Sequence, residues 1–487
     1  YLNRRDTQRK DELTLRGGLA WQGTNQRVEA NWHFFDVDNG YDAFSLDNTR
    51  QTLSDEPGRD TLQTHAGRLK WSSQGKVNLS AQLSVADTDT EYAYDEDWAY
   101  VGIAPAPEYS SFDTYLRDRD MQSLEIRADS DHDSWRWTVG GYLKHERETL
   151  TRQYTYLESD FNSALTVDTG AVFGQLDVNL TDTVTAFLGG RLEQRKADYA
   201  DSEEVNSDLT DNLWSGRLGI DWAPSPQQSF YLSISRGVRA GGPNSTLLSN
   251  GAALSASQEN PADKLGQFDE ESLINTEVGW RWRSASGALQ SALALFSMER
   301  RDQQVKQSLN LVREDGSTQF IEYTDNAAKG HNRGVEWQGA WSPTQTVQLE
   351  ASLGYLRARF DTYRTATGQD LSGRDQPQAP EWMGNVGIRW TLSQNWLAGA
   401  DISAMDSYFF SDRHSVRSPS RQLVNAHLDW TWDSWRISLW GRNLSNETYY
   451  TRGFGSFGND PRKGYVLEPY FQYGEPRTYG ITLNYER

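Results

Sequence analysis

The stretch Trp214-Ser-Gly-Arg-Leu-Gly-Ile-Asp-Trp222 places apolar and polar side chains on opposite faces of an extended chain. One face carries Trp214, Leu218, Ile220 and Trp222, and the other carries Ser215, Arg217, Gly219 and Asp221. A period of two residues predicts a β-strand with one apolar side. The same rhythm returns at residues 347–355, 386–392, 424–432 and 479–485. The chain is therefore predicted to be all-β, with antiparallel strands.

Composition limits the kinds of all-β protein that fit. The 487 residues are 36% hydrophobic, include 19 Trp and 23 Tyr, and carry a net charge of −20. The absence of Cys excludes disulfides and thiolate sites, and the acidic balance disfavours nucleic acid as a partner. No run of 18 apolar residues occurs. A transmembrane β-barrel reconciles these features, because it needs apolar side chains only at every second strand position.

Short and longer connections alternate along the whole chain. The nine short ones lie around residues 23–24, 73–74, 131–132, 181–182, 224–225, 285–286, 343–344, 393–394 and 432–433. The nine longer ones lie at residues 38–61, 91–118, 150–167, 199–209, 240–269, 309–319, 361–379, 406–420 and 445–475. Outer-membrane barrels have short periplasmic turns and long outer loops, whereas a soluble β-rich glycan-binding protein or enzyme has no reason for this asymmetry. We therefore predict a transmembrane antiparallel β-barrel with about 19 visible strands.

The strand count also bears on what precedes the sequence. Bacterial single-chain barrels close with an even number of strands. An odd count of 19 therefore predicts that the chain starts mid-barrel and that at least one N-terminal strand is missing.

Several segments resemble a TonB-dependent outer-membrane receptor. They are Tyr231–Asn244, Glu271–Trp280, Asn326–Glu336, Asn443–Tyr449, Glu475–Tyr485 and, in the first half, Asp38–Asn48. The resemblance implies that residues 1–487 are the β-barrel domain of a 22-stranded barrel, with the N-terminal plug and the first strands missing. The family usually ends in Phe, whereas this sequence ends in Arg487.

The resemblance further implies a function at the outer membrane of a Gram-negative bacterium. Its task would be TonB-energised uptake of a scarce ligand, with a ferric siderophore as the first expectation. Cobalamin, a glycan or haem are alternative ligands, and a passive porin-type channel is an alternative function. The implied partners are outer-membrane lipid, lipopolysaccharide and the TonB energy-coupling complex, which would bind the missing N-terminal region. Iron would be present only within a transported chelate, so no cofactor is expected.

Candidate ligand-binding residues are aromatic and cationic side chains of the longer connections. They are Tyr94, Trp98, Tyr100, Tyr408, Phe409, Arg413, Arg417, Tyr450, Arg452, Phe454, Phe457 and Tyr465. Aromatic faces beside cations suit catecholate or sugar ligands and anionic iron chelates. The competing explanation is that these rings pack the loops against one another.

Three arginines on the polar side of predicted strands, Arg217, Arg389 and Arg436, are expected to face the lumen. There they would bind the plug or an anionic ligand, or form cross-strand ion pairs with residues such as Asp221 or Glu350.

The sequence contains no motif that predicts catalysis or a metal site. Residues 36–47 resemble a calcium loop only superficially, because Gly40 falls one place early and Asp47 replaces the final Glu. There is no His-Glu-x-x-His, Gly-x-Ser-x-Gly or Gly-x-x-x-x-Gly-Lys sequence. We therefore predict a protein that is not an enzyme.

Overall fold

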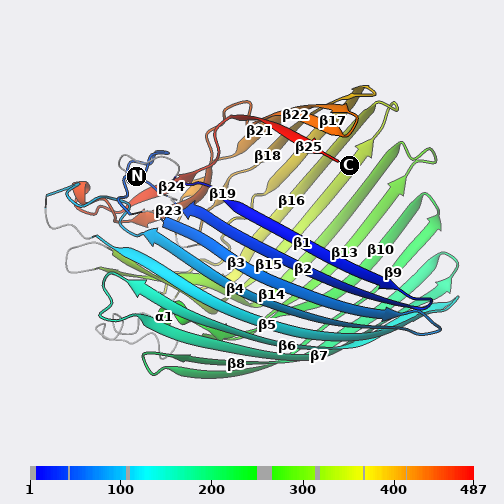
Figure 1. Ribbon diagram of the computed structural model, residues 1–487, viewed down its shortest axis with the longest axis horizontal. Coiled ribbons are helices and arrows are strands. Elements are labelled where there is room, and N and C mark those ends of the chain that lie inside the picture. Colours follow the sequence, from blue (N-terminus) through cyan, green and yellow to red (C-terminus); the bar gives the residue numbers. More distant parts are fainter. Residues whose placement is uncertain are drawn as a thin grey trace.

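The computed structural model describes residues 7–41, 44–56, 58–105, 110–248, 266–312, 318–365, 368–412 and 414–486. Within these ranges, no helix is long and apolar enough to cross a membrane. One antiparallel sheet of 19 strands dominates the structure (Figure 1). The predicted all-β class and strand number are confirmed.

Each strand of the large sheet pairs with its neighbour in the chain. In order, the strands are β1 (Glu12–Gln22), β2 (Gln26–Tyr41), β3 (Gly58–Ser73), β4 (Asn78–Asp95), β5 (Phe112–Asp131), β6 (Trp135–Tyr154), β7 (Phe161–Thr181), β8 (Val184–Asp201), β9 (Asn206–Ser225), β10 (Gln228–Arg239), β13 (Glu271–Arg283), β14 (Leu289–Val312), β15 (Thr318–Trp341), β16 (Val347–Tyr363), β17 (Trp382–Ser393), β18 (Trp396–Met405), β21 (Arg421–Trp432), β22 (Trp435–Arg442) and β25 (Thr478–Tyr485).

The longer connections contain the smaller elements. These are the strand pairs β11 (Gly242–Pro243) with β12 (Gln267–Phe268), β19 (Tyr408–Phe409) with β20 (Arg417–Ser418) and β23 (Tyr450–Phe457) with β24 (Glu468–Tyr473), the helix α1 (Ser245–Leu248) and the 3-10 helix η1 (Pro461–Lys463).

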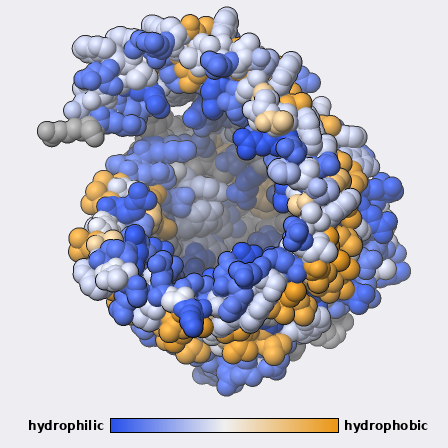
Figure 2. Space-filling model, turned by 90° about the vertical axis from the view of Figure 1, so that its right-hand side faces the viewer, coloured by the Kyte–Doolittle hydropathy of each residue, from blue (hydrophilic) through white to orange (hydrophobic). Residues whose placement is uncertain are grey.

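The strand register separates an apolar outer face from a polar inner face. Between β9 and β10, Leu218 lies opposite Ile234 and Ile220 opposite Leu232, so the apolar faces of both strands coincide. Leu188, Leu192, Trp214 and Leu218 are each more than half exposed. Such a continuous apolar exterior would be unfavourable in water but is favourable against lipid. The sheet curls around a hollow whose rim is largely polar (Figure 2).

Short hairpins lie at one end of the strands and the longer connections at the other (Figure 1). Three predicted loops, at 150–167, 199–209 and 309–319, nevertheless consist largely of strand. β6 and β7 leave only 155–160 outside, and β8 and β9 leave 202–205. In the third case β14 reaches Val312 and β15 begins at Thr318, and residues 313–317 lie outside the described ranges. The strands continue beyond the apolar face because the N–H and C=O groups of the paired strands still hydrogen-bond to each other there. In the tightest case, the Asp201 carboxylate accepts from the Glu203 and Val205 amides at 3.0 Å each.

The sheet has two edge strands. β1 pairs only with β2, and β25 pairs only with β22. Among the residues that the structure describes, no backbone pairing joins β1 to β25.

Candidate ligand-binding vestibule

Two adjoining cavities lie among the longer connections, and together we call them the vestibule. The first, of about 310 Å³, lies beside the ends of β2, β3, β4 and β5. The second, of about 590 Å³, lies between β14, β15 and the loops after β16, β18 and β22. Phe44, Arg452 and Phe454 line both cavities. The three residues therefore form a wall where the two spaces meet.

The first cavity is built from aromatic rings. Phe44 contacts Trp98 and Phe454 with ring centroids 5.1 and 4.8 Å apart. On the other side, Tyr41 and Tyr92 meet edge to face at 5.0 Å. Rings in these geometries attract one another beyond their burial, so the wall is preorganised for a flat or aromatic group.

A tight turn after β4 brings Trp98 into this wall. The Asp95 carboxylate accepts from the amides of Asp97 and Trp98 at 3.1 Å each. Trp98 itself has a φ of 54°, a left-handed conformation that is uncommon for a bulky residue. The turn is also tied to the last loop, because Asn459 donates from its side chain to the Glu96 carbonyl at 3.0 Å.

A buried ion pair supports the tyrosines behind the cavity. Arg152 donates to both carboxylate oxygens of Asp113 at 2.9 Å, and the two side chains are 6% and 2% exposed. Tyr94 and Tyr115 donate their hydroxyls to the same carboxylate at 3.2 and 3.0 Å. One carboxylate therefore orients two phenols that line the cavity.

Two carboxyl groups in the loops beside the cavity have raised pKa values. Burial raises the pKa of Asp97, which lies in the loop after β4 and is 4% exposed. Burial, together with the nearby Asp55 and Asp97 charges, also raises the pKa of Glu56 in the preceding loop. Both shifts favour the neutral form of the carboxyl group, which can donate as well as accept a hydrogen bond.

The second cavity is lined by amide side chains. Gln304 donates to the carbonyls of Ala240 and Asp269 at 2.9 Å each, and Gln376 donates to that of Arg359 at 3.0 Å. The buried Oε1 atoms of Gln303 and Gln304 have no hydrogen-bond partner among the described residues. These two amide oxygens are buried in the cavity wall without a described donor.

Arg452 provides positive charge where the cavities meet. Its guanidinium donates to the Tyr41 hydroxyl at 3.0 Å and lies 5.7 Å from the centre of the Phe44 ring. Arg117, Arg300 and Lys306, which also line the vestibule, each pair with a glutamate. Within the described ranges, Arg452 forms no ion pair. Its charge is therefore available to an anionic ligand.

Comparison with known proteins identifies the family. The profile described as "TonB dependent receptor-like, beta-barrel" matches residues 1–444. The chain belongs to this TonB-dependent receptor family. The match confirms the family resemblance of the sequence motifs.

Individual relatives agree with the family. The chain is 25% identical over 334 residues to the ferric-pyoverdine 358 receptor of Pseudomonas putida, which covers 63% of this chain and 34% of that protein. The fold of the present chain matches that of the ferric yersiniabactin uptake receptor FyuA from Yersinia pestis with a TM-score of 0.74 at 16% identity. The match covers 97% of the present chain and 70% of FyuA. The siderophore receptor PiuA from Acinetobacter baumannii gives a TM-score of 0.74 at 13% identity, over 98% and 74%. The structural matches establish the fold of this TonB-dependent receptor.

The vestibule brings together only some of the residues predicted to bind ligand. Tyr94 and Trp98 line the first cavity, Phe457 lines the second, and Arg452 and Phe454 line both. Phe457 is 7% exposed and belongs to a buried cluster with Phe44, Leu46, Ala99 and Tyr470.

The other predicted residues lie outside both cavities. Phe409 contacts the guanidiniums of Arg374 and Arg417, which lie 4.3 and 3.9 Å from its ring centre. Tyr450 stacks on Phe471 at 4.3 Å. Tyr100, Tyr408 and Tyr465 are not lining residues. Arg413 lies outside the described residues. For Phe409, Arg417 and Tyr450, the observed contacts are those of loops packing together.

Sequence reasoning missed several lining residues. Phe44 lies in the 38–48 segment that carried the family resemblance, and Tyr92 and Tyr115 lie in the aromatic-rich 91–118 segment. The sequence therefore contained a usable signal for all three residues. Gln303 and Gln304 had none, because an uncharged amide inside a long polar strand is not distinctive.

The three predicted lumenal arginines lie on the inner face, on the positions between the outward apolar ones. Arg217 donates to Gln175 and lies over the Phe187 ring, not beside Asp221. None of the three forms an ion pair with a described residue, so the expected pairing with Asp221 or Glu350 was wrong. Neutral amides and rings satisfy Arg217 instead.

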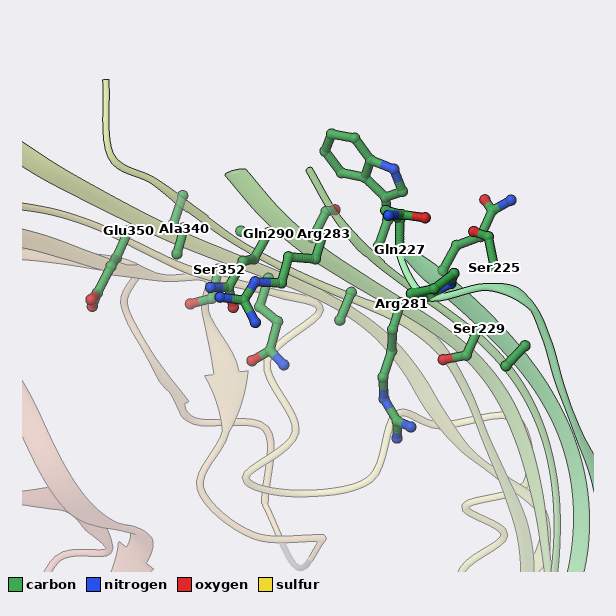
Figure 3. Close-up of a pocket in the computed structure, with 18 of the residues that line it drawn as sticks. Ser225, Gln227, Ser229, Arg281, Arg283, Gln290, Ala340, Glu350 and Ser352 are labelled. Carbon is green, nitrogen blue, oxygen red and sulfur yellow. The ribbon is translucent and has the colours of Figure 1, made fainter. Parts of the chain in front are cut away.

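A further cavity of about 690 Å³ lines the inner wall near the short turns. Figure 3 shows Arg281 of β13, Gln290 of β14 and Glu350 of β16 projecting to the same side of the sheet. This wall is polar and has many small side chains, including Ala340 and Ser352. The receptor therefore presents a polar interior at both ends of the sheet.

Proposed function

We propose that this chain is the barrel portion of an outer-membrane receptor that takes up a ferric siderophore. Membership of the TonB-dependent receptor family supports this proposal, as do the relatives whose names refer to ferric siderophores. Energy would come from a TonB complex acting through an N-terminal region beyond this sequence. Iron would enter as part of the cargo, and the protein would act as a transport receptor of a Gram-negative outer membrane and not as an enzyme.

The observation that carries the proposal is the position of Arg452. It is the arginine without a carboxylate partner at the junction of an aromatic and an amide-lined cavity. A ferric siderophore commonly combines anionic oxygen donors with aromatic or amide groups. Arg452 would bind the anionic oxygens, and the rings around Phe44 would contact a flat group.

The test is binding and uptake of radiolabelled ferric siderophores by the native protein and by Arg452→Gln. A hydrogen bond to a charged group contributes about 1.5–3 kcal/mol, so the variant should bind its anionic ligand roughly 10- to 100-fold more weakly. Arg364→Gln is the matched control, because Arg364 is an exposed loop arginine that already pairs with Asp370 at 3.4 Å. If both variants bind the ligand with equal affinity, Arg452 is not part of the binding site. Growth on iron that is independent of TonB would contradict energised uptake.

A further inference from the structure

The connection between β10 and β13 is attached to a more distant strand of the sheet. We call its described parts, residues 240–248 and 266–270, the strap. The short strands β11 and β12 form the stem of the strap, with Gly242 opposite Phe268. Gly241 fits beside them because a Cβ atom there would lie only 2.4 Å from the Phe268 carbonyl oxygen. The strap therefore turns closely against its own stem before it reaches α1.

Asn244 joins the strap to β15. Its side-chain amide donates to the Thr324 carbonyl at 2.8 Å, and its side-chain oxygen accepts from the Thr324 backbone amide at 2.8 Å. Thr324 lies beyond Ala328, where the pairing of β15 with β16 ends. The Asn244 side chain thus pairs with the backbone of Thr324 as a peptide group of a neighbouring strand would. Asn244 is 5% exposed, so these hydrogen bonds are shielded from water.

Asn326, two residues after Thr324 on β15, makes the reciprocal contact. Its side-chain oxygen accepts from the Asp269 backbone amide at 2.7 Å, and its side-chain amide donates to the carbonyls of Asp269 and Asp302 at 2.9 and 2.8 Å. Both asparagines belong to the segments that resemble the receptor family, at the end of one and the start of the other. The strap and β15 therefore each supply one asparagine to the backbone of the other.

The strap reaches both cavities of the vestibule from the loop end of the sheet (Figure 1). Thr246, two residues after Asn244, lines the first cavity, and the next residues, Leu247 and Leu248, are buried. Gln304, which lines the second cavity, donates to two carbonyls of the strap at 2.9 Å each. The strap thus connects a wall of one cavity with a wall of the other.

We propose that Asn244 and Asn326 are positioning residues of the vestibule, which hold the strap on β15 so that Thr246 stays in the wall of the first cavity. This role rests on the proposed function, because it concerns a cavity in which a ferric siderophore would bind. Without the two asparagines, the strap would keep its stem and its contacts with Gln304 but would lose its attachment to β15. The first cavity would then widen on this side and bind its ligand less tightly.

The first test needs no ligand. Asn244→Asp keeps the size of the side chain but turns a second acceptor toward the Thr324 carbonyl. Amide hydrogen exchange of residues 240–248 in the complete native protein should become roughly 10-fold faster or more. Asn206→Asp is the matched control, because it adds the same charge in an exposed hairpin where Asn206 donates to the nearby Glu204 carbonyl at 3.1 Å. If the two variants exchange alike in the strap, Asn244 does not hold it and the proposal is overturned.

The second test separates positioning of Thr246 from a general effect on folding. Thr246→Trp should weaken binding of the radiolabelled ferric siderophore roughly 10-fold or more, because the bulky ring would fill part of the first cavity, whereas Thr246→Ser should bind normally. In a receptor that also carries Asn244→Asp, the strap is released and Thr246→Trp should weaken binding less than about 3-fold. A loss of equal size in both receptors would mean that Asn244 does not place Thr246, and would overturn the proposal.

The two tests also distinguish this proposal from the proposed function. If the unaltered receptor binds none of the ferric siderophores, the proposed function fails, and the exchange measurement still decides whether the asparagines hold the strap. If Asn244→Asp does not fold, Asn326→Asp takes its place, because it breaks the reciprocal contact with Asp269. It should accelerate exchange of the strap and reduce the effect of Thr246→Trp in the same way. Unchanged exchange, or an unreduced effect of Thr246→Trp, would overturn the proposal.

Discussion

Replacing Asp113 with Ala should destabilise the loop-side ends of β5 and β6 by about 3–5 kcal/mol. The replacement leaves Arg152 as an unpaired cation that is only 6% exposed, and removing one partner of a buried ion pair typically costs about 3–5 kcal/mol. Coulomb's law gives a similar size, since two unit charges 4 Å apart interact by about 4 kcal/mol at an effective dielectric constant of about 20. The two arguments agree on the magnitude.

The consequence should reach the vestibule. Tyr94 and Tyr115 both lose their acceptor when Asp113 is replaced, and both line the first cavity. The affinity for the ligand should therefore fall, even though neither Arg152 nor Asp113 lines that cavity. The wall formed by Phe44, Arg452 and Phe454 is not contacted by Asp113 and should persist.

Amide hydrogen exchange of residues 110–116 and 150–154 in detergent measures this effect. A change of 3–5 kcal/mol should increase the open population of this region by roughly two to four powers of ten. The matched control is Glu146→Ala on the same pair of strands, where the partner Arg119 is half exposed and the ion pair at 2.7 Å should contribute less than about 1 kcal/mol. If Asp113→Ala and Glu146→Ala exchange at similar rates, the buried pair does not hold these two strand ends together.

Two other perturbations test the loop carboxyls and the direction of the strand faces. Burial raises the pKa of the Asp97 carboxyl in the folded loop. The protonated Asp97 side chain therefore contributes fully to the stability of the loop below the ordinary carboxyl pKa near 4, and this contribution is lost as the pH rises through the pKa of the folded state. The protection factors of residues 96–105, which correct for the intrinsic rise of amide exchange with pH, should therefore fall as the pH rises above about 4, and Asp97→Asn should flatten this fall. Leu218→Arg, on the outward face, should cost about 2–4 kcal/mol in urea unfolding from lipid vesicles, whereas Ser215→Arg on the inner face should cost far less; equal costs would contradict the assigned faces.

The strands could be predicted from sequence because their information is local. The alternation from Trp214 to Trp222 fixes which side chains face outward, and the observed register with β10 keeps that parity. The ends of the outer strands could not be predicted in the same way. Beyond the apolar face, both sides of a strand are polar, so the pattern that distinguishes a strand from a loop disappears. The 199–209 segment shows this, because a hairpin of 202–205 replaces the expected long loop.

The vestibule was harder to predict because its walls join residues far apart in sequence. Phe44 and Phe454 belong to the first and last of the longer connections, and no periodicity links them. Aromatic and cationic composition indicated which loops could contribute, yet it could not separate Phe454, which lines both cavities, from Tyr450, which packs on Phe471. Gln303 and Gln304 acquire their significance only from burial and from the lack of a partner for their oxygens.

The same distant contacts give the loops a structural role in addition to binding. Arg462 of the last loop donates to Asp47 of the first at 2.7 Å, and Asn48 accepts from the Phe471 amide at 2.9 Å. These loops follow β2 and β22, which are the partners of the two edge strands β1 and β25. Loop packing therefore draws the two margins of the sheet together at the end where ligand would enter, although no backbone pairing joins β1 to β25 in the described residues. Because Phe44 lies between Arg452 and Trp98, a ligand at this junction would contact the same residues that hold the margins together. Binding there should consequently stiffen the loop end of the sheet as a whole, and not only the vestibule.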